Sequence, residues 1–218
     1  MGPRELDLRW GPDPERLREV ASHLLAGGLV AMPTETVYGF GGVPEKAPLM
    51  ELQRLKDRGP EKPFLLLVPS AESVPELRWG PDARELAGVF WPGALTLILE
   101  DPEGRFPEGV RSEGGGVAIR VSPHPVAKAV VEAVNGPLVS TSANTPGGPP
   151  ALTAPEALKT ARILGAGDLL WVLDGGPLAP SSPSTIVDCT GPRPVVRREG
   201  SLKVDRLKCV LPGIHEQL

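Results

Sequence analysis

Apolar residues in this chain follow two periods, and each period predicts one type of element. Between Leu17 and Leu25 they recur at i, i+3, i+4, i+7 and i+8, which predicts a helix with one apolar face. Asp13-Pro14 suits the start of that helix, as an N-cap followed by proline in the first turn, and Gly27-Gly28 suits its end. Continuous apolar runs such as Phe64–Val68 instead predict strands that are covered on both faces.

Across the whole chain the two patterns alternate. Further helices are predicted at about 45–57, at 82–90, after a Ser122-Pro123 cap, at 154–164 behind Thr153, and at 202–209. Strands are predicted at 29–32, 64–68, 95–99, 117–121, 138–140, 169–173, 184–189 and 194–198. The last three strands are too close together for helical crossovers, so part of the sheet should be antiparallel. Because the sequence shows no linker long enough to divide the chain, we expect one α/β domain over residues 1–218. The segment 101–116 is rich in glycine, proline and charge, which predicts a mobile loop.

The composition allows a large core and argues against several protein classes. The chain has 218 residues, of which 40% are hydrophobic. It has no apolar run of 18 residues, so we expect no membrane span, and its charged N-terminus is unlike a signal peptide. Two cysteines cannot form a disulfide framework, and a cytoplasmic location is the expectation. The net charge of −4 argues against a general nucleic-acid-binding protein but allows a local basic cleft.

Amide side chains are rare in this sequence. It contains two asparagines and two glutamines but 27 prolines. Few thermolabile amides and proline-rich loops are typical of a thermophile, although a GC-rich genome would produce the same bias. In either case, an asparagine that persists in a polar stretch, such as Asn144, draws attention.

The stretch Met32–Gly42 combines many polar groups with three glycines. Thr34–Thr36 supply two hydroxyls and a carboxylate, and Tyr38 is the only tyrosine of the chain. Glycines permit positive φ and close approach of the backbone to a ligand. We therefore expect the strand at 29–32 to deliver polar groups at its tip, where ligands bind in open α/β sheets. An ordinary turn rich in threonine and glycine is the alternative.

Three cations lie within seven residues at the predicted end of the second helix. Lys56, Arg58 and Lys62 flank Gly59-Pro60, where the chain can turn the first two into one cleft. Arginine offers a bidentate fork for phosphate, and lysine offers a mobile point charge. Cations are also favoured at a helix C-terminus by the helix dipole, so phosphate binding and simple helix stabilisation both stay open.

Other polar groups lie in or after predicted strands. Ser140–Asn144 could donate to phosphate or ribose oxygens, or could form a local turn. Arg120 interrupts an apolar strand, and a buried arginine must pair with an internal carboxylate or face a ligand that carries one. Ser184–Asp188 and Arg197–Gly200 are weaker signals, because alternating hydroxyls on a strand are common.

Several familiar catalytic motifs are missing from the sequence. It has no Walker lysine motif, Gly-x-Gly-x-x-Gly turn, Gly-x-Ser-x-Gly elbow or His-Glu-x-x-His. A covalent nucleophile and a protein-held metal are therefore not implied. The remaining inventory of cations, hydroxyls, an amide and backbone N–H groups suits a phosphate-bearing ligand.

Taken together, these stretches resemble the YrdC-like family, whose motifs occur here in the family's order over about residues 15–202. The matching stretches are Pro33-Thr34-Glu35-Thr36-Val37-Tyr38-Gly39, Lys56-x-Arg58 with Lys62-Pro63-Phe64, Trp91-Pro92-Gly93-Ala94-Leu95-Thr96, Ala118-Ile119-Arg120, Ser142-Ala143-Asn144, Ser184-Thr185-Ile186-Val187-Asp188 and Arg198-Glu199-Gly200. The resemblance implies a single domain with a twisted mixed sheet, flanking helices and an open, concave, basic cleft.

The resemblance also implies a nucleotidyltransferase, threonylcarbamoyl-AMP synthase. This enzyme condenses L-threonine, bicarbonate and ATP to threonylcarbamoyl-adenylate and pyrophosphate, with Mg²⁺ bound through ATP. Downstream threonylcarbamoyl-transferase proteins then use the adenylate in tRNA processing. The residues carried over by motif are Lys56 and Arg58 as catalytic groups; Lys56, Arg58, Thr96, Ser142, Asn144 and Arg198 for ATP; and Thr34, Tyr38, Arg120, Ser140 and Ser184 for threonine. Because carbamate is short-lived in water, we expect the 145–150 loop to close over the site.

A second interpretation of the same resemblance is a non-catalytic relative whose basic cleft binds double-stranded RNA or tRNA. Binding through RNA phosphates should weaken steeply with salt, whereas a threonine-dependent reaction should depend on Lys56, Arg58 and Arg120. The net charge and the positions of Arg120 and Ser184 favour the enzyme.

Overall fold

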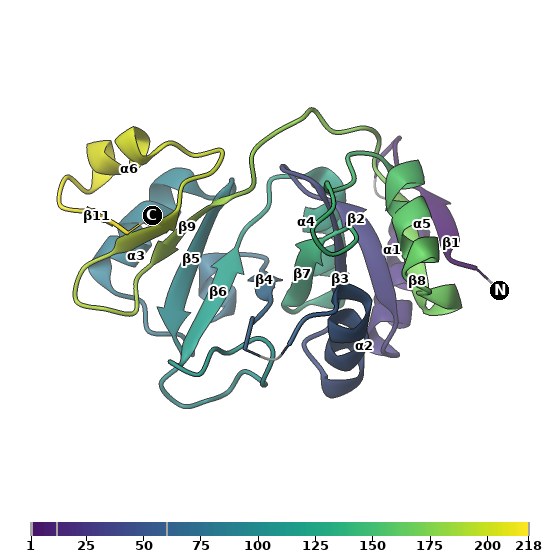
Figure 1. Ribbon diagram of the computed structural model, residues 1–218, viewed down its shortest axis with the longest axis horizontal. Coiled ribbons are helices and arrows are strands. Elements are labelled where there is room, and N and C mark those ends of the chain that lie inside the picture. Colours follow the sequence, from purple (N-terminus) through teal and green to yellow (C-terminus); the bar gives the residue numbers. More distant parts are fainter. Residues whose placement is uncertain (1, 12, 60, 218) are drawn as a thin grey trace.

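The computed structural model describes residues 2–11, 13–59 and 61–217, which form an eleven-stranded mixed sheet with six α-helices (Figure 1). The helices are α1 Pro14–Leu25, α2 Lys46–Lys56, α3 Pro81–Phe90, α4 Pro125–Val134, α5 Ala154–Ile163 and α6 Val204–Val210. The strands are β1 Arg4–Asp7, β2 Leu29–Pro33, β3 Tyr38–Gly42, β4 Leu65–Leu67, β5 Leu95–Glu100, β6 Gly116–Arg120, β7 Leu138–Ser142, β8 Leu170–Asp174, β9 Thr185–Asp188, β10 Val195–Arg198 and β11 His215–Glu216. Pro60, predicted to end the second helix, lies outside the described residues.

The strand order is β1-β8-β2-β3-β7-β4-β6-β5-β9-β10-β11, with parallel and antiparallel neighbours intermixed. The predicted mixed α/β fold is thus confirmed. Strands β9 and β10 form the expected antiparallel pair, but β8 lies near the other end, parallel to both β1 and β2. The segment 175–184 therefore crosses from one end of the sheet to the other (Figure 1).

The stretch Met32–Gly42 is more regular than the sequence suggested. Only residues 34–37 form a turn, and Tyr38–Gly42 is a strand paired with both β2 and β7. Gly39 and Gly41 allow close approach of β7, because a Cβ on Gly41 would lie 2.4 Å from the carbonyl oxygen of Val139. The glycines serve strand packing, and none of them needs a positive φ.

The helices cover the two faces of the sheet unequally. Helices α2, α3, α5 and α6 share one apolar core with the first face, along most of the strands. On the second face, α1 and α4 pack together against β2 and the residues around it. The rest of the second face has no covering helix among the described residues, and a cavity lined by many small or polar side chains lies there.

Two local predictions need correction. Helix α4 is capped by His124, whose Nδ1 accepts from Val126 N at 3.3 Å, whereas Ser122 lies two residues earlier. The 101–116 segment is tied to the core, because Phe106 is buried and Asp101 accepts from Arg105 N and Phe106 N. Among the described residues, no helix combines the length and apolarity needed to cross a bilayer.

Candidate functional site

A cavity of about 360 Å³ occupies the part of the second sheet face that no described helix covers. Its size is that of a small-molecule site. Small side chains on the central strands leave the space open, among them Gly39, Ala118 and Ser140. Of the predicted site residues, the lining contains Thr34, Arg58, Thr96, Arg120, Ser140, Ser142, Ser184 and Arg198.

Tyr38 does not reach this cavity, so its predicted place in the cleft is wrong. Its side chain is fully buried, and its hydroxyl donates to Gly176 O at 2.7 Å and accepts from Gly175 N at 3.2 Å. Burial raises the pKa of this phenol. Because side chains alternate along a strand, Tyr38 faces the covered side of the sheet while Gly39 faces the cavity. Tyr38 instead anchors the crossing segment 175–184.

Arg120 combines the two alternatives that the sequence left open. Its side chain is nearly inaccessible, and Nη1 lies 3.1 Å from Glu35 Oε1 in an internal ion pair. It also lines the cavity, and among the described residues its buried Nε meets no hydrogen-bond acceptor. Burial lowers the pKa of Arg120, Glu35 opposes this shift, and Arg198 adds to it. The guanidinium is thus half paired and faces an open space.

Glu35, the partner of Arg120, is a residue to which the sequence interpretation gave no role. Its second carboxylate oxygen accepts from Ser122 Oγ at 2.6 Å. Glu35 lies behind Arg120 and is not part of the cavity lining. The sequence did indicate that Arg120 needs a partner, because a buried arginine in an apolar strand requires a carboxylate nearby. It did not indicate which carboxylate this is.

Lys56 and Asn144 lie next to the cavity wall rather than in it. Lys56 Nζ donates to Ser142 O at 2.8 Å, to Asn144 O at 2.7 Å and to Asn144 Oδ1 at 2.5 Å. Burial, with a contribution from Arg58, lowers the pKa of Lys56 to about 8. Asn144 Nδ2 in turn donates to Gly148 O at 2.7 Å. Lys56 therefore fixes the end of β7 and the base of the loop that follows.

Asp57 separates the two cations of the Lys-x-Arg motif. It adopts the left-handed conformation, with φ 44°, and ends α2 between Lys56 and Arg58. The reversal explains how two residues that cannot share a helix face reach the same region.

The Arg58 guanidinium is satisfied by main-chain acceptors. Its Nε donates to Lys62 O at 2.5 Å and its Nη2 to Pro63 O at 2.8 Å, with the guanidinium 4.8 Å from the centre of the Phe64 ring. Burial lowers its pKa. No carboxylate is among these hydrogen-bond partners, although the charge of Glu61 acts on Arg58 and opposes the effect of burial on its pKa.

Hydroxyl groups complete the opposite wall. Thr96 Oγ1 and Ser184 Oγ lie 2.9 Å apart, and both residues are buried. Arg198 donates through Nη2 to Ser184 O at 2.8 Å, which joins β10 to the end of the crossing segment. On the other side, Thr34 Oγ1 donates to Val37 O at 2.8 Å within the turn.

The electrostatic character of the cavity follows from its lining. Arg58, Arg120 and Arg198 contribute three positive charges, and the described lining contains no carboxylate. An anionic ligand, or one with separate carboxylate and phosphate groups, suits this arrangement. Main-chain acceptors and hydroxyls are available to orient it.

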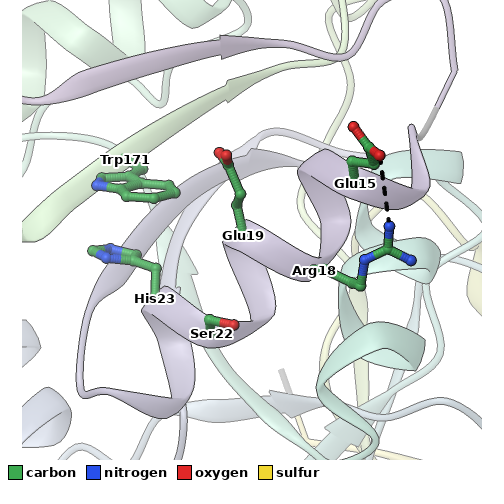
Figure 2. Close-up of a pocket in the computed structure, with 6 residues that line it drawn as sticks. All are labelled: Glu15, Arg18, Glu19, Ser22, His23 and Trp171. Atoms are coloured by element: carbon green, nitrogen blue, oxygen red, sulfur yellow. Dashed lines mark ion pairs between the residues drawn. The ribbon is translucent and has the colours of Figure 1, made fainter.

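A second depression lies away from this cavity, on α1 (Figure 2). It is lined by Glu15, Arg18, Glu19, Ser22, His23 and Trp171. Figure 2 shows His23 stacked on Trp171, with ring centres 4.0 Å apart, and an ion pair between Glu15 and Arg18. Its charges are mixed and it contains none of the predicted site residues.

Comparison with known proteins gives a consistent family. The Sua5/YciO/YrdC family model, described as "Telomere recombination", matches residues 22–200. The chain is 36% identical over 177 residues to the threonylcarbamoyl-AMP synthase of Chromohalobacter salexigens. The aligned region covers 80% of this chain and 92% of that protein. Crystal structures of P. abyssi Sua5 in complex with L-threonine and of E. coli YciO are similar in fold.

The structural agreement extends over nearly the whole chain. P. abyssi Sua5 superimposes with a TM-score of 0.88 at 29% identity, over 98% of this chain and 62% of Sua5. E. coli YciO superimposes with a TM-score of 0.80 at 25% identity, over 95% of this chain and all of YciO. The chain belongs to the Sua5/YciO/YrdC family.

Proposed function

We propose that this chain is a threonylcarbamoyl-AMP synthase that condenses L-threonine, bicarbonate and ATP. The observation that carries the proposal is the half-paired, buried Arg120, which lines one cavity together with Arg58 and Arg198. One cavity thus offers a carboxylate-binding group and separate cations for phosphates. The named activity of the C. salexigens relative and the L-threonine bound to P. abyssi Sua5 support the same assignment.

In this proposal Arg120 binds the carboxylate of L-threonine. A guanidinium edge matches a carboxylate in geometry and charge, and burial strengthens the pair. The hydroxyls of Thr34, Ser140 and Ser184 lie around the same cavity and can orient the amino acid. In this proposal the amino group faces the open part of the cavity. Its nitrogen attacks the carbon of bicarbonate, a C–O bond breaks, and the carbamate forms with loss of water.

The second step transfers the adenylyl group. A carbamate oxygen attacks the α-phosphorus of ATP, and the bond to the bridging α–β oxygen breaks with release of pyrophosphate. This step needs the triphosphate charge neutralised and held in line, which Arg58, Arg198 and Lys56 supply. Thr96, Ser142 and Asn144 complete the proposed ATP contacts. Since the described lining carries no carboxylate, Mg²⁺ enters as MgATP and not as a protein-held ion.

The test is pyrophosphate release from ATP, with and without L-threonine and bicarbonate. Wild type should require both co-substrates, and Lys56→Ala should lose most of the activity. Lys46→Ala is the matched control, because Lys46 is an exposed lysine at the start of the same helix. The adenylate product, which downstream threonylcarbamoyl-transferase proteins would use for tRNA modification, is identified by mass.

A different outcome would replace the proposal. If ATP is untouched, or if turnover ignores threonine, the synthase assignment fails. A tRNA titration at several salt concentrations then decides whether the basic cavity binds RNA. For such binding, the logarithm of the binding constant falls linearly with the logarithm of the salt concentration.

A further inference from the structure

We infer that Glu35 is a positioning residue: its ion pair with Nη1 holds one end of the Arg120 guanidinium, so that the rest of this group is left for the substrate carboxylate. The inference rests on the proposed function, in which Arg120 receives the carboxylate of L-threonine. It adds a residue that does not touch the substrate and that acts through Arg120.

The carboxylate of Glu35 is held by a hydrogen bond at one oxygen and by an ion pair without hydrogen-bond geometry at the other. Oε1 lies 3.1 Å from Arg120 Nη1, and Oε2 accepts from Ser122 Oγ at 2.6 Å. Ser122 Oγ also accepts from His124 N at 3.2 Å, directly before α4. The turn between β2 and β3, the end of β6 and the start of α4 therefore converge on one carboxylate. A group held from three elements has little freedom to move.

The pairing determines which edge of the guanidinium remains available. An arginine has five N–H donors in a planar fork and can present either of two edges to a carboxylate. Because Nη1 faces Glu35, the side bearing Nε is the one without a partner among the described residues, and Arg120 lines the cavity. Without Glu35 the guanidinium would be free to turn, and the ligand would meet several orientations of it.

The charges around Glu35 agree with this role. Arg120 faces it directly, and Arg198 and His124 are further ionisable groups that interact with this cluster. Glu35 neutralises much of the charge of Arg120 without lining the cavity. Binding of a carboxylate therefore relies on the fixed geometry of Arg120 more than on its net charge. In this sense Glu35 preorganises Arg120 for the ligand.

The experiment measures L-threonine binding by calorimetry and the separate KM values for L-threonine and ATP on the full chain. Glu35→Ala should raise the Kd and KM for L-threonine about tenfold or more and leave the KM for ATP within about twofold. Glu35→Gln, which keeps an acceptor oxygen, should show a smaller rise. Ser122→Ala removes only the second anchor and should raise the same constants by a few-fold.

Glu100→Gln is the matched control, because Glu100 pairs with Arg78 at 2.6 Å outside the cavity. It removes the same charge and should change neither KM. The inference is overturned if L-threonine binds equally well or more tightly in the Glu35 and Ser122 variants, as expected if Glu35 only weakened the charge of Arg120. It is also overturned if the KM values for both substrates rise together with a fall in melting temperature, since that pattern marks a purely structural ion pair. A wild type that neither binds L-threonine nor releases pyrophosphate overturns the proposed function itself, and this inference with it.

Discussion

The two cationic ends of the cavity are built in opposite ways. At one end, Arg120 is nearly inaccessible and paired with a carboxylate that is itself anchored. At the other end, Arg58 in the cavity lining and Lys56 beside it are partly exposed and donate to main-chain and amide oxygens of their own chain. The first arrangement fixes one direction in space and suits a single small carboxylate. The second bonds its cations to carbonyl and amide oxygens rather than to carboxylates, and it suits a larger, more variable anion such as a triphosphate.

This difference also separates stability from activity. A buried charge pair is costly to break from one side, because the remaining charge has lost its partner. A partly exposed cation bound to carbonyl oxygens can be removed at smaller cost. We therefore expect variants at the Arg120 end to lose folding stability and threonine binding together, and variants at the Arg58 end to lose mainly the ATP-dependent function.

The largest effect is expected for Arg120→Ala. It should lower kcat/KM for L-threonine by about 100-fold or more and the free energy of unfolding by about 3 kcal/mol, because Glu35 keeps a mostly buried charge without a partner. Pyrophosphate release at subsaturating threonine and urea unfolding measure the two quantities. Arg120→Lys keeps the charge without the fork and should recover part of the stability but little of the threonine dependence. Unchanged stability in both variants would contradict the contrast between the two ends.

Arg58→Ala should come next. Loss of this cation should lower kcat/KM for ATP by about 30-fold, while the Kd for L-threonine stays within about twofold. The free energy of unfolding should fall by about 1 kcal/mol, since the lost hydrogen bonds run to carbonyls that water can reach. Steady-state kinetics with each substrate varied in turn separate these effects. An equal loss for both substrates would mean that the two ends act as one unit.

The pH dependence tests Lys56. Its pKa is lowered from the ordinary lysine value to about 8, mainly by burial, so the charged form is lost as pH rises through about 8. Activity should therefore fall above pH 8, by about tenfold per pH unit at the limit. Lys56→Arg stays charged and should move this fall to higher pH.

Stability should show the opposite sign in the same pH range. The folded-state pKa lies below the unfolded-state value, so burial disfavours the charged lysine below about pH 8. That cost is relieved as pH rises towards 10.5. We expect activity to fall over this titration while the protein stays folded, which circular dichroism at each pH measures. If the protein unfolds as the activity falls, a group other than Lys56 controls the pH dependence.

The smallest effect is expected at the hydroxyl pair. Thr96→Val keeps the shape of the buried side chain but removes the hydroxyl partner of Ser184 Oγ and leaves it the longer contact with Arg198 Nη2. The change should cost about 1 kcal/mol in stability and a few-fold in substrate affinity. A double-mutant cycle with Ser184→Ala measures whether the pair acts jointly. Strictly additive effects would show that the 2.9 Å contact contributes nothing of its own.

Local sequence patterns determined much of the fold. The helical period and the caps at Asp13 and Thr153 placed α1 and α5, and both caps make the predicted side-chain bonds. Apolar runs located β2, β4, β5 and β6. These features depend on residues a few positions apart, so the sequence alone carries the information. The resemblance of ordered motifs likewise selected most of the residues that line the cavity.

Only the tertiary structure decided which groups meet. Glu35 and Arg120 are far apart in sequence, and nothing local predicts that they pair. Tyr38 was misplaced because the strand character of Tyr38–Gly42 depends on pairing with β2 and β7, which determines the face of the sheet that each side chain occupies. The position of β8 beside β1 is a long-range choice of the same kind. Period and propensity act over one turn or one strand, whereas the site is defined by contacts that form only when the whole sheet has assembled.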